Sequence, residues 1–286
     1  MQKTILLAAV ALLGNPGLTL AQNTAEENNP NVDAPFVRNI RADRPGQTIT
    51  AQVLQPGRFQ LETGFQRRFG GPGFAQSLSG ATLRIGFFNS MELRVSQPYF
   101  HSGPTIATET GPASASGLAP AVVGAKFMIS PNYDTRTQVA ILAESALPNT
   151  GSAGLRQRNW APSGRLLVSQ QIGERFGLEG NFGFSQHGLK VADVEKGQFL
   201  GTLALNGPLS DKTCFFVEAY GYGRSGLSTG TTTGIYYRPV PAVHGGFTAG
   251  RVLGGAAAGT ATMGGGLTFK IGQYVFWLID AGRLSC

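Results

Sequence analysis

The chain has 286 residues, a formal net charge of +7, 41 glycines and only 14% charged residues. Such a basic balance raises the question of nucleic-acid binding. The lysines and arginines are scattered singly, however, with no block and no stripe of interleaved aromatic residues. We therefore exclude nucleic acid as a partner. The length suits one domain, and the mean hydropathy near zero is typical of strands that alternate lipid-facing and polar residues rather than of buried helices.

The first 21 residues have the features of a secretory signal peptide. Lys3 supplies the positive region, Ile5–Leu13 the apolar run, and Thr19-Leu20-Ala21 a small-x-small cleavage site. The apolar run is too short to span a bilayer, and no later segment has 18 consecutive apolar residues. We expect cleavage after Ala21 and an exported mature chain without a transmembrane helix.

Residues 22–57 have no hydrophobic periodicity and are expected to form a polar leader, in the periplasm or in the mouth of a barrel. Eleven segments with period-two alternation follow, and Arg58–Phe69 is the clearest, because Phe59, Leu61 and their successors alternate with polar residues. The segments are 58–69, 77–89, 91–100, 119–129, 137–147, 163–172, 175–186, 197–206, 213–223, 262–270 and 274–284.

The connections between these segments alternate between tight and long. Tight connections lie near 89–90, 130–137, 173–174, 207–212 and 272–273, and long ones near 70–76, 101–118, 148–162, 187–196 and 224–260. Short turns on one side and long loops on the other are typical of outer-membrane barrels. We therefore predict an all-β fold, an antiparallel transmembrane β-barrel of about 12 strands over residues 58–286, of which 11 strands are readable.

Charged residues recur singly on the polar faces of these strands, acidic on the strands expected to run outward and basic on several that run inward. On the lipid face each charge would cost about 2–4 kcal/mol at mid-bilayer, so we expect these side chains to point into the lumen and to pair across strands. Two interpretations are open: the charges fill and rigidify a narrow lumen, or they line a solute path and set its selectivity. This charge ladder consists of Glu62, Arg84, Glu92, Lys126, Glu144, Arg165, Glu179 and Glu218.

Two motifs go beyond pattern. Asp43-Arg44-Pro45 is followed by Pro56-Gly57-x-Phe-Gln-x-Glu62-x-Gly, and residues 216–221 read Phe-Val-Glu-Ala-Tyr-Gly. Together they resemble a family of bacterial outer-membrane proteins that is named for the meta-pathway of phenol degradation and whose members are described as transporters. The resemblance covers residues 40–282. It implies an outer-membrane barrel of about twelve strands and a link to the uptake of small, often aromatic, compounds.

The C-terminal region departs from that family. Residues 265–269 and 278–282 resemble its penultimate hairpin, but no strand ending in an aromatic residue follows. Eleven strands would leave an open edge in the bilayer, where each unpaired backbone group is costly. We therefore expect a truncated or frameshifted chain that lacks the terminal aromatic residue read by the barrel assembly machinery. The expectation fails if part of 22–57, or an extra strand hidden in the Gly-rich stretch 245–266, closes the gap.

No residue set predicts an enzyme, a metal site or a cofactor. His101, His187 and His244 lie singly at strand ends or in loops, without metal-ligand spacing. His101-Ser102 lacks the third group that would orient a nucleophile and base. Cys214 and Cys286 are expected to be unpaired thiols, although an exported chain permits a disulfide. Aromatic belts at the two membrane interfaces are expected from Tyr99, Phe100, Tyr220, Tyr222, Tyr236, Tyr237, Tyr274 and Trp277.

The function expected from these features is an outer-membrane channel or uptake protein for small molecules, with aromatic or hydrophobic compounds as candidate solutes. Its expected partners are outer-membrane lipid, lipopolysaccharide and the barrel assembly machinery. The alternative is a structural or surface-interaction barrel with a plugged lumen and no transport. Two interpretations of the loop arginines are open, contact with lipid phosphates at the outer surface or simple loop solubility. They are Arg156, Arg158, Arg224, Arg238 and Arg251.

Overall fold

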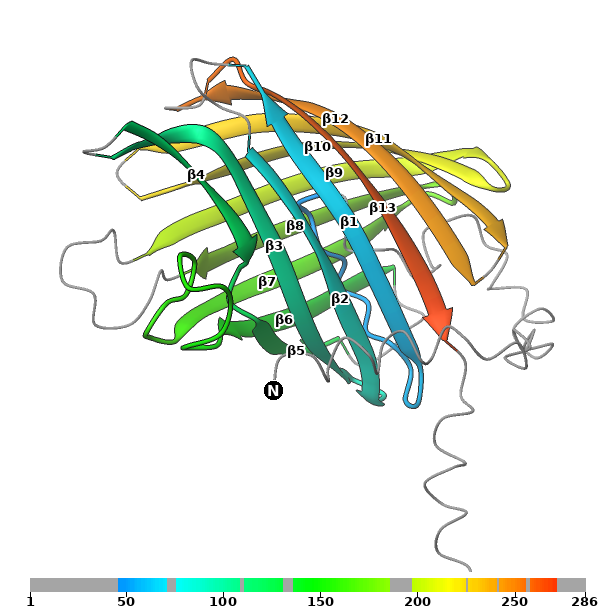
Figure 1. Cartoon of the computed structure of the whole chain (residues 1–286). Helices are drawn as coiled ribbons and strands as arrows, with labels where there is room; N and C mark the ends of the chain where they lie inside the picture. Colours follow the sequence, from blue (N-terminus) through cyan, green and yellow to red (C-terminus); the bar gives the residue numbers. More distant parts are fainter. Residues whose placement is uncertain are drawn as a thin grey trace, which may run out of the picture.

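The computed structural model describes residues 46–70, 76–108, 111–130, 136–185, 197–224, 226–240, 242–255 and 258–271, and these form thirteen strands without a helix (Figure 1). No described segment is a helix long and apolar enough to cross a membrane. The strands are β1 (Phe59–Phe69), β2 (Gln76–Phe88), β3 (Met91–Thr108), β4 (Gly111–Leu118), β5 (Val122–Met128), β6 (Thr137–Ala146), β7 (Ala161–Ile172), β8 (Phe176–Ser185), β9 (Gln198–Ser210), β10 (Thr213–Gly223), β11 (Leu227–Val240), β12 (Val243–Gly254) and β13 (Ala261–Ile271).

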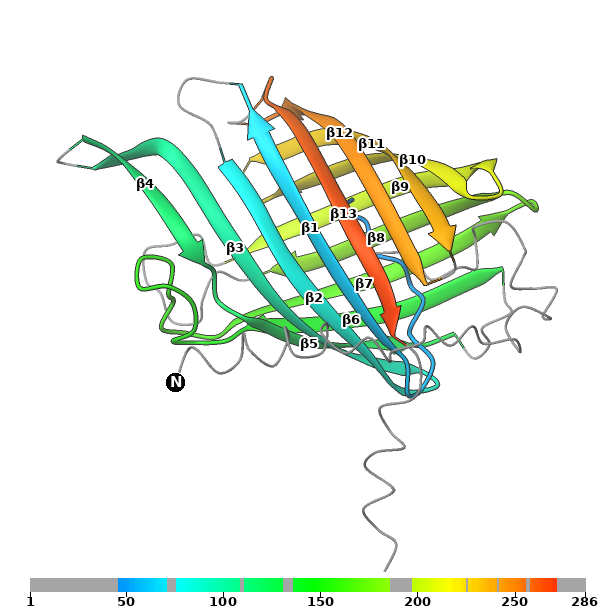
Figure 2. The ribbon, with the colours of Figure 1, turned by 45° about the vertical axis from the view of Figure 1, so that its right-hand side comes forward.

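Twelve of these strands close into an antiparallel ring. β1 pairs with β2 on one side and with β13 on the other, over the whole register from Phe59↔Ile271 to Phe69↔Ala261. β4 is the exception, because it pairs only with the outer part of β3 and leans out from the ring (Figure 2). The twelve strands of the described ring therefore have no open edge, as a membrane barrel requires.

The expectation of a missing closing strand is wrong. β11 and β12 lie in residues 227–254, where the sequence analysis placed a long loop, and they raise the number of strands in the ring to twelve. β12 confirms the alternative that a strand is hidden in the Gly-rich stretch. The strand expected over 274–284 and Cys286 lie outside the described residues, and the strand after β12 already closes the ring with β1.

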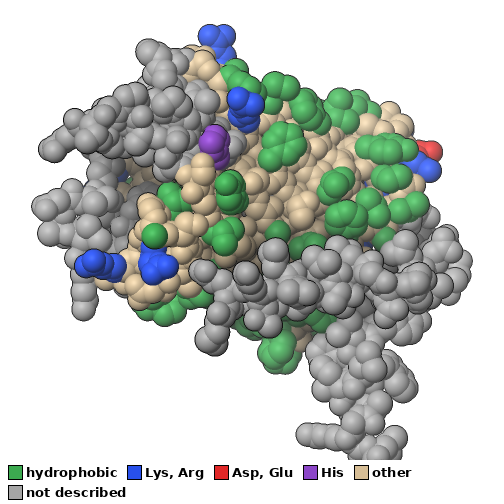
Figure 3. Space-filling view, in the orientation of Figure 1, with side chains coloured by type: hydrophobic (Ala, Val, Ile, Leu, Met, Phe, Trp, Pro, Cys, Tyr) green, Lys and Arg blue, Asp and Glu red, His purple; other side chains and the backbone are tan. Residues whose placement is uncertain are grey.

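Alternation along each strand separates an apolar outer face from a polar inner one. In β10, Val217 is 50% exposed, whereas its neighbours Phe216 and Glu218 are 4% and 1% exposed and face inward. Figure 3 shows apolar side chains over the outer wall of the ring. Such a surface is stable only against lipid. The outer face includes Phe65, Phe182, Leu203, Val217, Ile235, Phe247 and Leu267.

Short turns gather at one end of the barrel, as predicted. They join β2 to β3, β7 to β8, β9 to β10 and β11 to β12, and the chain enters β1 at the same end. By the usual orientation of such barrels this is the periplasmic end. Arg238 lies here rather than at the outer surface, because its backbone N–H donates to the Lys212 carbonyl in the β9–β10 turn (2.8 Å). The interpretation that Arg238 contacts lipid phosphates at the outer surface is therefore wrong.

Residues 46–55, which we call the lumen segment, run inside the ring before β1 begins (blue in Figure 2). The sequence analysis placed them in the polar leader. Thr48, Ile49, Ala51, Val53 and Leu54 are all buried there, although the segment belongs to no strand. The barrel core therefore consists of the inward side chains of the wall together with this extended piece of chain.

A candidate functional site in the lumen

The lumen segment begins at β10. The carboxylate of Glu218 accepts the backbone N–H groups of Gln47 (2.9 Å) and Thr48 (2.5 Å). The Thr48 hydroxyl donates to the Thr202 hydroxyl of β9 (2.9 Å). Backbone donors that have no strand partner are thus satisfied by side chains of the wall, as buried amides require.

The middle of the segment is bound by one amide side chain and a small apolar patch. Asn181 of β8 accepts the N–H of Ile49 at Oδ1 and donates from Nδ2 to the Ile49 carbonyl, both at 2.7 Å. It therefore replaces both hydrogen bonds that a neighbouring strand would make with Ile49. The N–H of Ala51 donates to the Ser169 hydroxyl of β7 (3.0 Å). Ile49 and Ala51 also form a buried apolar cluster with Ala140, Leu142 and Leu167.

The far end of the segment meets charged side chains of β2, β3 and β5. The ammonium group of Lys126 donates to the carbonyls of Thr50 (3.0 Å) and Gln52 (3.1 Å). The N–H of Leu54 donates to the Glu92 carboxylate (2.9 Å). The guanidinium of Arg84 on β2 donates to the Gln52 carbonyl (3.3 Å), so the segment spans the lumen from β10 to β2 and contacts eight strands, β2, β3 and β5 to β10.

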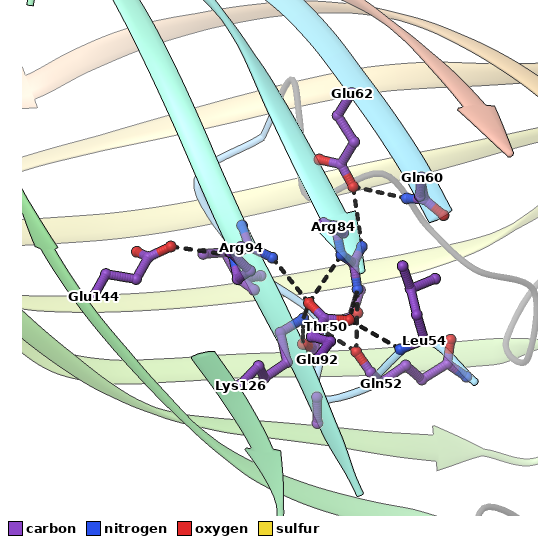
Figure 4. Close-up of polar contacts among 12 residues, drawn as sticks. Thr50, Gln52, Leu54, Gln60, Glu62, Arg84, Glu92, Arg94, Lys126 and Glu144 are labelled. Atoms are coloured by element: carbon purple, nitrogen blue, oxygen red, sulfur yellow. Dashed lines mark hydrogen bonds and ion pairs between the residues drawn. The ribbon is translucent and has the colours of Figure 1, made fainter. Parts of the chain in front are cut away.

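Six charged side chains form an ionic cluster at this far end (Figure 4). Arg84 contacts Glu62 (3.0 Å) and Glu92 (2.7 Å). Glu92 also lies 3.2 Å from Arg94 and 3.5 Å from Lys126, and Arg94 reaches Glu144 at 3.1 Å. The cluster holds three acidic and three basic groups, so its formal charge is zero. Its members are Glu62, Arg84, Glu92, Arg94, Lys126 and Glu144.

Strand register explains how these groups meet. Glu92 and Lys126 are directly opposite on β3 and β5, whereas Arg84 and Glu92 are diagonal neighbours on β2 and β3. Arg94 and Glu144 are two strands apart, and Gly124 of β5 lies opposite both. A Cβ on Gly124 would lie 2.5 Å from Cγ of Glu144, so the glycine leaves the room in which Arg94 and Glu144 meet.

The cluster is buried, and this makes its neutrality important. Glu92 and Lys126 are fully buried, and Glu62 and Arg84 are nearly so. Taking ions out of water costs several kcal/mol each, which mutual attraction offsets only when geometry is good and hydrogen bonds are complete. Here Arg84 makes a two-pronged contact with Glu92 through Nε (2.9 Å) and Nη2 (2.7 Å). Such bidentate pairs are among the strong ones.

The charge ladder predicted from sequence therefore divides into two groups. Five of its members join the ionic cluster, together with Arg94, which lies outside the predicted ladder and shares β3 with Glu92. Glu179 and Glu218 lie elsewhere, on β8 and β10, beside the start of the lumen segment. Arg165 lies half-buried on the lumen side of β7, opposite Leu142 and Gly183.

The N-terminal motif residues contribute the turn into β1. Gly57 adopts a φ of 74°, which favours glycine, and its N–H donates to the Gly86 carbonyl (3.0 Å). Gly86 in turn has no room for a Cβ, which would collide with the carbonyl of Gln55. Pro56 precedes this turn, and Glu62 belongs to the ionic cluster. Asp43, Arg44 and Pro45 lie outside the described residues.

Several aromatic residues assigned to interface belts face the lumen instead. Tyr220 is buried on β10 and stacks on Tyr222, with ring centroids 6.3 Å apart. Tyr236 of β11 stacks on Phe216 at 5.1 Å. Gly230 and Gly234 of β11 provide the space for Tyr220 and Phe216. The belt prediction is wrong for Tyr220, Tyr222 and Tyr236, because strand parity directs them inward.

Residues 42–276 match the sequence pattern of a protein family described as "Putative MetA-pathway of phenol degradation". The chain belongs to this family. The match includes the lumen segment, the β1 turn and all described strands of the ring. No curated protein matches the chain in sequence.

Solved structures share the fold. An outer-membrane channel from Pseudomonas putida F1 has a TM-score of 0.60 and 12% identity, over 79% of this chain and 99% of that one. The NanC porin has a TM-score of 0.55 and 9% identity, over 74% and 100%. The KdgM porin, in complex with disordered oligogalacturonate, has a TM-score of 0.54 and 9% identity, over 74% and 99%. At these identities the likeness establishes the barrel fold.

Proposed function

We propose that the protein is an outer-membrane channel for small molecules whose path is narrowed by the lumen segment. The observation that carries this proposal is the way in which the segment is held. Its backbone is bound by single side chains from six strands, and it forms no continuous ladder with any strand. Separate contacts of this kind can be exchanged locally while the closed wall remains intact.

The alternative, a plugged barrel without transport, rests on the same segment, since it crosses the lumen from β10 to β2. The two functions differ in whether the segment can leave its contacts under physiological conditions. A disulfide between the segment and the wall distinguishes them. Ala51 and Ser169 suit this purpose, because the Ala51 N–H lies 3.0 Å from the Ser169 hydroxyl.

The experiment is a planar-bilayer recording of Ala51→Cys/Ser169→Cys in a background with Cys214→Ser and Cys286→Ser. We expect reproducible openings from the reduced protein and a loss of most openings after oxidation. The control is the Cys214→Ser/Cys286→Ser background protein, recorded after reduction and after oxidation. Silence from folded, reduced protein contradicts transport and favours the plugged barrel. Equal conductance in both redox states contradicts the proposal that the lumen segment must leave its contacts before the channel conducts.

The solute class we propose is small, uncharged and aromatic. Its support is the pair of aromatic stacks on the lumen face, Tyr220–Tyr222 and Phe216–Tyr236, since planar rings bind well against such surfaces. The family description points the same way. Phenol added to the bilayer chamber is expected to interrupt the ion current more than cyclohexanol, a non-aromatic alcohol of similar size. Equal effects of the two alcohols contradict the aromatic preference but do not contradict the proposal that the protein is a channel.

A further inference from the structure

A second polar group lies in the lumen, away from the ionic cluster. It surrounds a small cavity between the start of the lumen segment and strands β8 to β11. The proposed channel uses the aromatic stack of Phe216 and Tyr236 at its edge but none of its polar side chains, and the family motif at residues 216–221 includes two of its residues, Phe216 and Glu218. The principal lining residues are Thr48, Glu179, Asn206, Phe216, Glu218 and Tyr236.

Strand register brings the two carboxylates of this cavity into one row. Glu218 of β10 lies opposite Ala204 of β9, and Ala204 lies opposite Glu179 of β8. Their Cα atoms are therefore about 10 Å apart, at two strand spacings. The small side chain of Ala204 leaves the space between them open. Like charges on these two side chains repel one another across the row.

Asn206 lacks hydrogen-bond partners for its amide group, and Glu218 lacks a counter-charge. Asn206 is 3% exposed, and neither its amide oxygen nor its amide nitrogen has a hydrogen-bond partner in the structure. Glu218 accepts backbone N–H groups from Gln47 and Thr48, and no lysine or arginine of the described part of the chain forms an ion pair with it. A buried carboxylate without a counter-charge, beside another carboxylate, is unfavourable.

We propose that this cavity is a binding site for a small hard cation of the calcium class, held by Glu179, Glu218 and Oδ1 of Asn206. Carboxylate and amide oxygens are the ligands that Ca²⁺ prefers. Oε2 of Glu218 accepts two N–H groups, whereas Oε1 accepts one at 3.1 Å and keeps a lone pair for a cation. Two carboxylates that share one such ion lie up to about 5 Å apart, within reach of side chains in this row.

The surroundings strengthen the site. Phe216 and Tyr236 stack at its edge and exclude water, which raises the attraction between an ion and its ligands. A bound cation bridges β8, β9 and β10, and through Glu218 it fixes Gln47 and Thr48 of the lumen segment. The site is independent of transport, because it requires only the folded wall and the first residues of that segment.

Terbium luminescence tests the proposal, because Tb³⁺ replaces Ca²⁺ at oxygen sites and a nearby tyrosine sensitises its emission. The full-length protein, folded in detergent and stripped with a chelator, is titrated with Tb³⁺ and then with Ca²⁺. We expect one saturable site that Ca²⁺ empties. Tyr236→Phe should dim the emission and leave the Ca²⁺ competition unchanged, which locates the ion beside β11.

Substitution of the ligands gives the decisive comparison. Glu179→Gln, Glu218→Gln and Asn206→Leu should each weaken Tb³⁺ and Ca²⁺ binding by roughly tenfold or more, since affinity follows ligand charge and number. Glu174→Gln makes the same charge change on an exposed residue of the β7–β8 turn and should leave binding unchanged. Heat-dependent mobility in SDS gels shows that each variant folds. Asn206→Leu removes no hydrogen bond, so it carries the test if Glu218→Gln does not fold.

Three results overturn the proposal. The first is the absence of saturable Tb³⁺ emission from folded protein, and the second is Tb³⁺ and Ca²⁺ binding that is unchanged in Asn206→Leu and Glu179→Gln. The third is an unfolding free energy that rises on addition of tetramethylammonium but not of Ca²⁺. None of these decides the channel. The bilayer recordings run in chelator, without added divalent ions, so a silent channel and a missing cation site are separate outcomes.

Discussion

Glu92 is the centre of the ionic cluster, and its replacement tests whether buried neutrality stabilises the barrel. The Glu92→Gln side chain keeps its shape and an acceptor for the Leu54 N–H, but it loses the negative charge that faces Arg84, Arg94 and Lys126. Three positive groups then face only two negative ones. Breaking a buried pair in this way costs about 3–5 kcal/mol, because it leaves an uncompensated buried charge.

The assay is equilibrium unfolding of the protein from lipid vesicles in guanidinium chloride, followed by tryptophan fluorescence. With a denaturant slope of about 2–4 kcal/mol/M, the midpoint should fall by on the order of 1 M. Glu174→Gln, on an exposed turn, should stay within about 0.5 kcal/mol of the parent protein.

A second substitution makes the test specific to charge. Lys126→Met in the Glu92→Gln background restores equal numbers of acidic and basic groups, although it also removes the ammonium contacts to Thr50 and Gln52. The double variant should therefore be destabilised by clearly less than the sum of the two single variants. An unchanged midpoint for Glu92→Gln, or strict additivity, would refute the reasoning.

Three further predictions concern the wall, the lumen segment and the lipid face. Gly124→Ala should cost about 1–3 kcal/mol in unfolding free energy, because its Cβ would lie 2.5 Å from the Ala143 carbonyl oxygen, whereas Gly164→Ala, with open space around it, should be nearly neutral. Asn181→Ala should remove both hydrogen bonds to Ile49, each worth about 0.5–1.5 kcal/mol, and speed hydrogen exchange of the lumen segment without affecting β10. Leu203→Lys, at mid-strand on the lipid face, should destabilise by about 2–4 kcal/mol, and the same change at Leu227, near the strand end, by about 0–1 kcal/mol.

Strands whose two faces differ clearly in polarity could be predicted from sequence. Strands with an inward face of glycine and threonine could not. β10 alternates Phe215 and Val217 with polar or aromatic residues, so its period is visible. In β11 and β12 the inward positions are largely glycine and threonine. Tyr220 and Phe216 occupy the space above Gly230 and Gly234 of β11, and threonine side chains pack against Gly250 of β12. Glycine and threonine are typical of loops as well as of tightly packed strands. The Gly-rich stretch therefore has the composition of a long connection, and its strands cannot be told from a loop by sequence alone.

For a similar reason, only part of the candidate site could be predicted from the sequence. The inward charges follow from the cost of placing them in lipid, and five of the eight join one cluster. The lumen segment carries no periodicity, since side chains from 118 to 171 positions away satisfy its backbone at Ala51, Ile49 and Gln47. The sequence around the lumen segment carries no pattern that predicts these distant hydrogen-bond partners.

The seam between β1 and β13 also determines the order in which this molecule can be assembled. Residues 59 and 271 must meet before the ring exists, so the decisive contact is among the most distant in the described chain. Folding that depends on such remote pairings is slow. The lumen segment is joined directly to β1, and its anchors on β8 and β10 are made late in the chain. The wall therefore closes around the lumen segment of its own polypeptide, and a closed ring that has missed this step must reopen or rethread the segment from the periplasmic end.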